Sequence, residues 1–288
     1  MARTIAYSQA VQAVRQACRD AAFNLPQDVL AALQKARRTE TNARAQRILD
    51  QLLENAALAA ADRIPLCQDT GLLVAFIDQG AAAIIAPPAD RPDATLIDAV
   101  NEGVAAGYAE GYLRKSVVAE PLNQRKNTAT NTPAIIHHTV VSGDMLHITL
   151  MAKGGGCENK SQFKMFNPTD SPEAVQRWIL EVVKNAGPNA CPPFVIGVGL
   201  GGNFELSCLL SKRALLRDIG IVHADPFYAK LEADLLAAIN ATGIGPQGLG
   251  GDTTALAVHL ETAPCHIASL PVAVNIECHA HRHIHLTL

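Results

Sequence analysis

Charged residues, aromatic side chains and long apolar runs are all scarce in this sequence. Only 18% of the residues are charged, 4% are aromatic, and the formal net charge is -3. This balance argues against nucleic acid or an anionic membrane surface as a partner. No apolar run approaches the roughly 20 residues that a membrane-spanning helix needs, and the first residues lack the apolar stretch of a secretory signal. We therefore expect a cytoplasmic protein.

Closely spaced cysteine pairs are also missing. The chain has seven cysteines, an odd number in a chain without an export signal, which argues against a disulfide framework. No two of them form a C-x-x-C pair, which excludes the zinc-ribbon, thioredoxin and ferredoxin patterns. If cysteines bind a metal here, loops that are distant in the sequence must bring them together.

Helical periodicity dominates the start of the chain, and mixed patterns follow it. Residues 1–62 predict a helical N-terminal region, because apolar residues recur at i, i+3, i+4 and i+7. Residues 63–288 predict a mixed α/β domain, either separate from the helical region or continuous with it. Within it, residues 133–141 and 145–153 are expected to pair as a hairpin. Helices first and mixed elements afterwards, without strict βαβ alternation, indicate the α+β class.

Three cysteines share a setting that the other cysteines lack. Cys67, Cys191 and Cys278 each lie in a loop or at the end of an element, beside proline or polar residues. Cys18 and Cys208 lie within helical patterns, where a small buried thiol is expected to be inert. Three thiolates suit a [4Fe–4S] cluster that leaves one iron without a protein ligand. That iron can act as a Lewis acid toward a hydroxyl and a carboxylate of a substrate.

A glycine-rich loop, KGGGCENKS at residues 153–161, follows an expected strand. Glycines there permit positive φ and let main-chain N–H groups approach an anion closely. The polar residues that follow favour a binding loop over a simple tight turn. The thiol of Cys157 stays open as a further ligand.

Two patterns offer rival functions. Gly197, Gly199 and Gly202 have the G-x-G-x-x-G spacing of a dinucleotide site, between a strand and a helix. Residues 219–225 make a poor second strand for such a site, which favours a glycine-lined turn instead. The alternating histidines 279, 281, 283 and 285 are compatible with zinc binding, although such a terminal strand or tail is more often solvated or at an interface.

Six motifs occur in order along most of the chain: LCQDTG, NTATNTPA, KGGGCENKS, NACPPF, GIGPQGLGG and VNIECHAHR. Together they resemble the α-subunit of two-subunit class I fumarases and L(+)-tartrate dehydratases. The resemblance implies an oxygen-sensitive hydro-lyase that contains a [4Fe–4S] cluster. It also implies that Cys67, Cys191 and Cys278 are the ligands of that cluster.

The same resemblance assigns a substrate site. Gln68 and Asp69 match the pair that contacts the substrate, and Arg114 falls where the family has a carboxylate-binding arginine. Gly155 matches a glycine whose N–H meets the substrate, and His266 matches an active-site histidine. Asp69 and His266 are the expected catalytic residues, with Asp69 either abstracting the proton or orienting the group that does so.

Substrate and partner are further expectations from the resemblance. The motifs GGGxEN and GLGGxTTALAV look more like the fumarase branch, so reversible hydration of fumarate to malate, a step of the tricarboxylic acid cycle, is expected first. Dehydration of L(+)-tartrate or of another 2-hydroxy diacid is the alternative. Cys157 stands where the family often has serine, and Asp252 where it often has lysine. Because single-chain relatives carry a further domain, a separate β-subunit is expected to complete the active site in a hetero-oligomer.

Overall fold

The computed structural model describes residues 2–288, and the chain divides into two compact units. Unit 1 comprises Met1–Pro26, Leu58–Gly154 and Arg282–Leu288, and unit 2 comprises Gln27–Ala57 and Gly155–His281. The expected boundary after residue 62 does not coincide with this division, because the N-terminal helices are shared between the units. The predicted α+β class and the helical N-terminal region are confirmed. Among residues 2–288, no helix is both long and apolar enough to cross a membrane.

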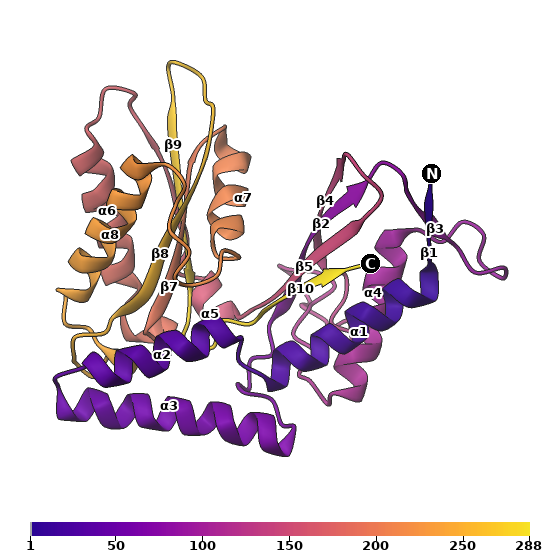
Figure 1. Cartoon of the computed structure of the whole chain (residues 1–288), viewed down its shortest axis with the longest axis horizontal. Helices are drawn as coiled ribbons and strands as arrows, with labels where there is room; N and C mark the ends of the chain where they lie inside the picture. The colour runs from indigo at the N-terminus through magenta and orange to yellow at the C-terminus, as the bar shows by residue number, and fades with distance from the viewer. Residues whose placement is uncertain (1) are drawn as a thin grey trace. The chain divides into compact units, whose positions relative to one another are not determined.

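A four-stranded sheet in the order β10-β5-β2-β4 forms the centre of unit 1. Its strands are β2 (Leu72–Gly80), β4 (Ile135–Val141), β5 (Leu146–Lys153) and β10 (His283–Thr287). A second, parallel sheet joins β1 (Arg3–Ala6) to β3 (Ala83–Ala86). Figure 1 labels these strands and the two helices that contribute to the core, α1 (Tyr7–Phe23) and α4 (Leu96–Glu110). Buried side chains from α1, α4, β2 and β5 make one hydrophobic core.

The predicted hairpin between β4 and β5 is wrong. The two strands do not pair with each other, because β2 lies between them. β2 runs parallel to β4 and antiparallel to β5. All nine of its residues are buried or half-buried, as suits a central strand with neighbours on both edges. The strand prediction for both segments holds, and the pairing of sequence neighbours does not.

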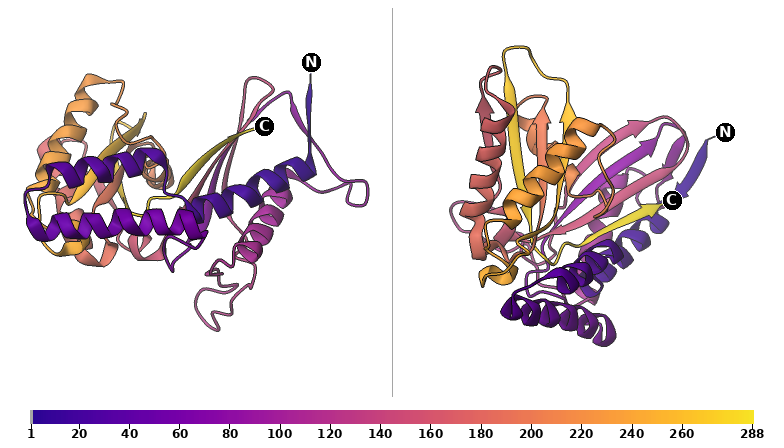
Figure 2. Two further views of the ribbon diagram at one scale, coloured as in Figure 1. Left: turned by 60° about the horizontal axis from the view of Figure 1, so that its bottom comes forward. Right: turned by 60° about the vertical axis from the view of Figure 1, so that its left-hand side comes forward.

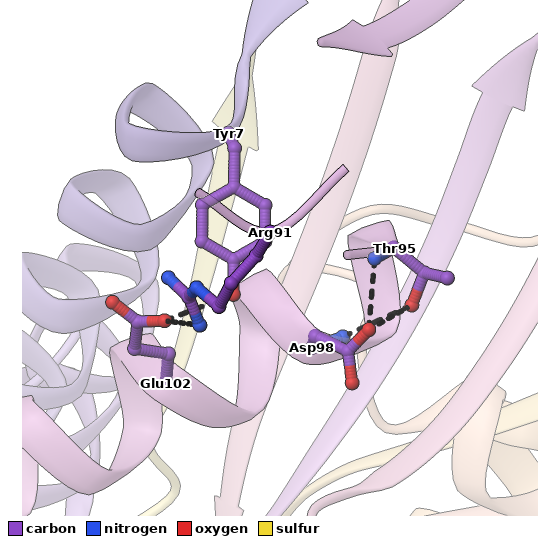
Figure 3. Close-up of polar contacts among 5 residues, drawn as sticks. All are labelled: Tyr7, Arg91, Thr95, Asp98 and Glu102. Atoms are coloured by element: carbon purple, nitrogen blue, oxygen red, sulfur yellow. Dashed lines mark hydrogen bonds and ion pairs between the residues drawn. The ribbon is translucent and has the colours of Figure 1, made fainter. Parts of the chain in front are cut away.

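Helices α1 and α4 approach each other closely because α4 carries two glycines at the contact. A Cβ at Gly103 would lie 2.7 Å from the carbonyl oxygen of Val11, and one at Gly107 would lie 2.7 Å from that of Arg15. Figure 3 shows polar contacts near the start of both helices. The Tyr7 hydroxyl donates to the Glu102 carboxylate at 2.9 Å, and Arg91 forms an ion pair with it at 3.0 Å.

The start of α4 is fixed by a reciprocal cap. The hydroxyl of Thr95 accepts the backbone N–H of Asp98, and the carboxylate of Asp98 accepts the backbone N–H of Thr95 at 2.8 Å (Figure 3). This capping box satisfies two donors that the first turn of a helix leaves without intrahelical partners. The hydrogen bonds to Asp98 also lower the pKa of its carboxyl group.

A second four-stranded sheet, in the order β6-β9-β7-β8, forms the centre of unit 2. Its strands are β6 (Gln162–Phe166), β7 (Phe194–Gly201), β8 (Ala255–Ala263) and β9 (Leu270–Glu277). Helices α6 (Pro172–Ala186) and α8 (Pro226–Asn240) cover one face, and α7 (Phe204–Ala214) covers the other (Figure 1). Short helical turns complete the unit: α5 (Gly155–Glu158), η1 (Gly187–Ala190) and η2 (Pro246–Gly248).

Two N-terminal helices also belong largely to unit 2. α2 (Gln27–Thr39) and residues 43–57 of α3 (Ala43–Asp62) lie side by side (Figure 2). An ion pair joins Arg37 of α2 to Asp50 of α3 at 2.6 Å. The hydroxyl of Ser171 accepts the N–H of Ala174 and caps the start of α6, and Gly187 ends that helix.

Candidate functional site

Residues 67–71, the CQDTG motif, form a turn in unit 1 that leads into β2. The backbone N–H of Gly71 donates to the Asp69 carboxylate at 3.0 Å, which closes the turn locally. Gly71 has φ +82, and a Cβ on it would lie 2.8 Å from the carbonyl carbon of Ala152 in β5. Only glycine combines this left-handed conformation with such a close approach. The Cys67 thiol is half-buried and donates to the side-chain oxygen of Gln68 at 3.4 Å.

Three buried polar side chains hold the main chain of this turn. The Tyr108 hydroxyl lies 2.7 Å from the Thr70 carbonyl, the Asn131 amide donates to the Gly71 carbonyl at 3.1 Å, and the Arg282 guanidinium donates to the Asp69 carbonyl at 2.8 Å. Each side chain is at most 1% exposed. Burial raises the pKa of Tyr108, so its hydroxyl stays a donor. The main chain of the turn is therefore fixed by hydrogen bonds that are buried away from water.

The segment containing Arg114 is tied to the same turn. The Thr70 hydroxyl donates to the Arg114 carbonyl at 2.8 Å, and the Asn131 side-chain oxygen accepts the N–H of Ser116 at 2.7 Å. The Arg114 side chain itself is exposed. Unit 1 thus brings the segments of three predicted site residues together: Gln68, Asp69 and Arg114. Sequence reasoning had not singled out Tyr108, Asn131 or Arg282, although Asn131 lies within the NTATNTPA motif and Arg282 ends the VNIECHAHR motif.

Two of the predicted cluster cysteines lie at one end of the sheet in unit 2. Cys191 precedes β7 and Cys278 follows β9, and these antiparallel strands place Val195 opposite Glu277. The backbone N–H of His279 donates to the Cys191 carbonyl at 3.2 Å. Cys191 has a left-handed backbone with φ 56 and an exposed side chain, whereas Cys278 is half-buried. Cys67, the third predicted ligand, belongs to unit 1, so its place in a shared site stays a prediction.

Gln247, a residue that sequence reasoning did not single out, braces the Cys191 loop. Its backbone N–H and its side-chain amide both donate to the Pro192 carbonyl, each at 2.8 Å. The amide nitrogen also lies 3.1 Å from Nδ1 of His279, and that Nδ1 lies 3.1 Å from the Cys191 carbonyl. Gln247 therefore links the loops that carry Cys191 and Cys278. Its place within the GIGPQGLGG motif was the signal that could have identified it.

The glycine-rich loop that carries Gln247 is fastened to the α2–α3 turn. The buried Glu40 carboxylate accepts the N–H groups of Asp252 and Thr253 at 2.9 and 3.0 Å. Asp252 in turn accepts the N–H and the hydroxyl of Thr41 at 3.0 and 2.5 Å. The hydrogen bonds from Thr41 lower the pKa of Asp252. Asp252, where the family often has lysine, thus helps to hold the glycine-rich loop against the α2–α3 turn, through hydrogen bonds in both directions within unit 2.

The KGGGCENKS segment runs from the last residue of β5 through α5 to the turn before β6 and is anchored on β9. Gly155 is the first residue of α5 and is exposed. Glu158 forms an ion pair with Lys212 of α7 at 2.5 Å and lies 3.5 Å from the Asn275 amide. The Ser161 hydroxyl accepts the N–H of Ile276 at 3.3 Å. These contacts press the buried Cys157 against the end of β9, where its thiol donates to Glu277 at 3.3 Å.

His266 lies far from the Cys191–Cys278 end of unit 2. It is exposed in the connection between β8 and β9, so all eight residues of β9 separate it from Cys278. At roughly 3.4 Å per residue that strand is about 27 Å long. Nδ1 of His266 accepts the N–H of Ala268 at 3.1 Å. Within one chain, the structure does not bring His266 to these two cysteines.

The glycine spacing of β7 is explained by packing. A Cβ at Gly197 would lie 2.0 Å from the Ser211 carbonyl oxygen, and one at Gly199 would lie 2.0 Å from that of Ser207. These glycines let α7 lie directly on the sheet. Residues 219–225 form no strand, so the second half of a dinucleotide-binding unit is not built there.

Two of the four alternating histidines at the end of the chain are part of a sheet. β10 contains His283 and His285 and pairs antiparallel with β5. His281 is buried, and its Nε2 lies 2.8 Å from the Leu215 carbonyl. The expectation of a solvated tail is therefore wrong for His281 and His283, which are at most 4% exposed.

One buried thiol in unit 1 and one cavity in unit 2 play no part in the predicted site. Cys18 is buried, and burial raises its pKa to about 12, as expected for an inert thiol. A cavity of about 590 Å³ in unit 2 lies among α2, α8 and β8. Alanine and other apolar side chains make up most of its lining, and none of the predicted site residues contributes to it.

Comparison with known proteins covers nearly the whole chain. The family model described as fumarate hydratase (Fumerase) matches residues 11–287. The putative L(+)-tartrate dehydratase subunit alpha of Methanocaldococcus jannaschii is 41% identical over 272 residues, which cover 92% of each chain. The L(+)-tartrate dehydratase subunit alpha of Escherichia coli is 33% identical over 260 residues, which cover 90% of this chain and 84% of that one.

Proposed function

Because the chain belongs to the fumarate hydratase family, we propose that it is the alpha subunit of an iron–sulfur hydro-lyase. The reaction is the reversible addition of water to a four-carbon dicarboxylate. The observation that carries this proposal is the CQDTG turn, whose main chain is fixed by three buried side chains. A short turn that is held by this many buried side chains is typical of a site whose exposed side chains must be kept in place.

Cys67, Cys191 and Cys278 would hold the [4Fe–4S] cluster. The donor set fits this group, because thiolates are its usual ligands and because hydrogen bonds hold the loops of Cys191 and Cys278 side by side. When bound, the cluster supplies a Lewis-acidic iron that lowers the cost of hydroxide departure. Gln247 and His279 would keep two of the three thiols at the separation that the cluster requires.

The chain's own residues would bind the substrate and handle its proton. The Arg114 guanidinium is exposed on a segment tied to the CQDTG turn, so it is available to bind a carboxylate that gains negative charge during the reaction. Gln68 and Asp69 would contact the substrate from the turn, and the Gly155 N–H from the start of α5. Asp69 either takes the proton from the substrate carbon or orients the group that does so, a role typically worth about 10²- to 10⁴-fold in rate.

His266 can take part in the reaction only from a second copy of the chain. Within its own chain, the length of β9 separates it from Cys278. An exposed histidine in the connection between β8 and β9 can reach a neighbouring subunit without rearranging the sheet. A catalytic role for His266 therefore goes with an assembly that contains at least two copies of this chain.

Two substrates come into consideration, because the family model is named for fumarate hydratase and the relatives for L(+)-tartrate dehydratase. Both reactions remove water from a 2-hydroxy dicarboxylate: malate gives fumarate, and tartrate gives the enol of oxaloacetate. The substrates differ by one hydroxyl group. The motifs GGGxEN and GLGGxTTALAV favour fumarate, and the names of the relatives favour L(+)-tartrate at least as strongly. We therefore propose both as candidate substrates.

A second subunit would complete the site. The relatives are named as alpha subunits, and a dicarboxylate requires two cationic anchors, of which Arg114 supplies one. We expect a separate beta subunit to provide the other. The alpha–beta pair would then be the catalytic unit.

The test is an anaerobic assay of this chain with and without its beta subunit, on malate, fumarate and L(+)-tartrate. We expect turnover of one hydroxy diacid by the pair and negligible turnover by the chain alone. Arg114→Gln should abolish turnover while leaving the iron content unchanged, and Arg38→Gln, which changes an exposed arginine on α2, should leave both unchanged. No turnover of any of these substrates by an iron-loaded pair would refute the proposal.

A further inference from the structure

Three side chains that could ligate a metal ion converge in unit 2, and only one of them, Cys278, belongs to the predicted cluster set. They are Cys157 from α5 and the neighbours Glu277 and Cys278 at the end of β9. One donor atom from each lies within 4.8 Å of the other two. Cys157 is 3% exposed and Glu277 is fully buried, while Cys278 is half-buried. The group therefore lies beneath the surface, with Cys278 nearest to solvent.

The two thiols meet at a single carboxylate oxygen. Sγ of Cys157 lies 3.3 Å from Oε1 of Glu277, and Sγ of Cys278 lies 3.7 Å from the same oxygen. In a tetrahedral zinc site, bond lengths of about 2.3 Å to sulfur and 2.1 Å to oxygen place a thiolate and a carboxylate oxygen about 3.6 Å apart. The two observed distances bracket that value. One ion in place of the thiol protons requires only small side-chain movements.

The same spacing is unsuited to a shared cluster. In an iron–sulfur cluster each thiolate binds a different iron, so its thiolates lie farther apart than two ligands of one ion do. The sulfurs of Cys157 and Cys278 lie within 4.8 Å of each other, which is too close for two ligands of one cluster without rearrangement. Nor is Cys157 loosely held, because the ion pair of Glu158 with Lys212 and the bond from Ile276 to Ser161 fix its segment to the sheet.

We propose that Cys157, Glu277 and Cys278 form a binding site for a single thiophilic divalent cation of the Zn²⁺ class, with a fourth position open to water. This site does not depend on the proposed reaction. If Cys278 is also a cluster ligand, the two occupants exclude each other, because one thiolate cannot serve both. A chain loaded with the single ion would then be unable to assemble the cluster until that ion leaves.

Cobalt is the probe, because Co²⁺ takes the place of Zn²⁺ and its thiolate bonds absorb in the near ultraviolet. The full chain, freed of metal by chelation under reducing and anaerobic conditions, is titrated with Co²⁺. We expect one Co²⁺ per chain with a thiolate charge-transfer band from two sulfurs. Binding by histidines alone gives no such band, so the terminal histidines do not interfere.

The variants separate the three ligands. Cys157→Ser should halve the charge-transfer intensity. It should also weaken Co²⁺ binding at least about tenfold, because losing a residue that merely orients a metal ligand already lowers metal affinity by about that factor. Glu277→Gln keeps both sulfurs, so it should weaken binding while retaining the full band. Cys191→Ser and Cys265→Ser are matched controls and should change neither quantity. Circular dichroism of each variant, and the retained band in Glu277→Gln, report whether the fold is intact.

Two results would overturn the site: an unchanged Co²⁺ spectrum in Cys157→Ser, or loss of the band in Cys191→Ser. Cluster assembly separates this inference from the proposed function. Cys157→Ser should still take up iron and sulfide anaerobically, whereas Cys191→Ser should not. If the wild-type chain takes up no cluster while the Co²⁺ results hold, the proposed function fails and the cation site stands.

Discussion

Replacing Asn131 by aspartate removes one hydrogen-bond donor from the support of the CQDTG turn and changes little else. Asn131 is fully buried, and its amide donates to the Gly71 carbonyl at 3.1 Å while its oxygen accepts the N–H of Ser116 at 2.7 Å. Its backbone is left-handed, with φ 61, a conformation that asparagine and aspartate both tolerate. The variant therefore keeps the shape, the backbone and the bond to Ser116.

The cost follows from what the new oxygen faces. A carboxylate oxygen would lie against the Gly71 carbonyl, so one buried acceptor would lose its donor, which costs about 1–3 kcal/mol. Burial of the added charge, or its neutralisation by a raised pKa, adds to this. We expect the free energy of unfolding to fall by about 3 kcal/mol and the turn to shift away from the Arg114 segment.

Urea unfolding and anaerobic iron uptake measure the two effects. Asn101→Asp is the matched control, because Asn101 also donates to a carbonyl, that of Ile97 at 3.0 Å, and accepts an N–H, that of Ala134 at 2.9 Å. Asn101 is half-buried, and neither of these hydrogen bonds touches the CQDTG turn or the Arg114 segment, so its variant should lose less stability and no iron. Equal stability losses in both variants, with iron uptake intact in both, would refute the role assigned to Asn131.

Three further predictions test other parts of the structure. Gln247→Asn keeps a residue that tolerates the left-handed φ of 53, but its side chain is too short to reach the Pro192 carbonyl. Bound iron should therefore be lost to a chelator several-fold faster than from the control Gln124→Asn, which changes an exposed residue. Equal rates would contradict the role assigned to the Gln247 side chain. Burial, and then the nearby charges of Arg217 and His281, lower the pKa of His259 to about 3. Since the unfolded state takes up the proton near pH 6.5, the free energy of unfolding should fall by about 2 kcal/mol from pH 7 to pH 5. In urea titrations, His259→Gln should remove that part of the loss. Gly199→Ala should abolish folding as judged by circular dichroism, because its Cβ would lie 2.0 Å from the Ser207 carbonyl oxygen, whereas Gly156→Ala, with its nearest atom at 3.9 Å, should fold normally.

Local sequence signals predicted the elements better than their partners. The Ser171 cap and the Gly187 stop of α6 were readable because capping depends on neighbours within a few residues. The pairing of β4 and β5 was not, because β2, which separates them, begins more than sixty residues before β4. A turn between two strands does not by itself exclude a third strand from the space between them.

The candidate site shows the same limit. The motifs marked the CQDTG turn and the loops of Cys191 and Cys278, because each is a short segment with unusual composition. The supporting residue Tyr108 is ordinary in sequence, and Arg282 is only the last residue of the VNIECHAHR motif. The roles of both arise from contacts with residues far away in the chain. Cys157 was noticed as a thiol in a glycine loop, and only its position against Glu277 suggests a ligand set.

The iron and acid-labile sulfide content of the anaerobically reconstituted chain tests the central claim most directly. The account predicts about four of each per wild-type chain. It predicts the same for Cys18→Ser, apart from any loss of stability caused by changing a buried residue. Cys67→Ser, Cys191→Ser and Cys278→Ser should each lose the cluster. A full cluster in Cys67→Ser would contradict the claim that the CQDTG turn and the two cysteines of unit 2 serve one site.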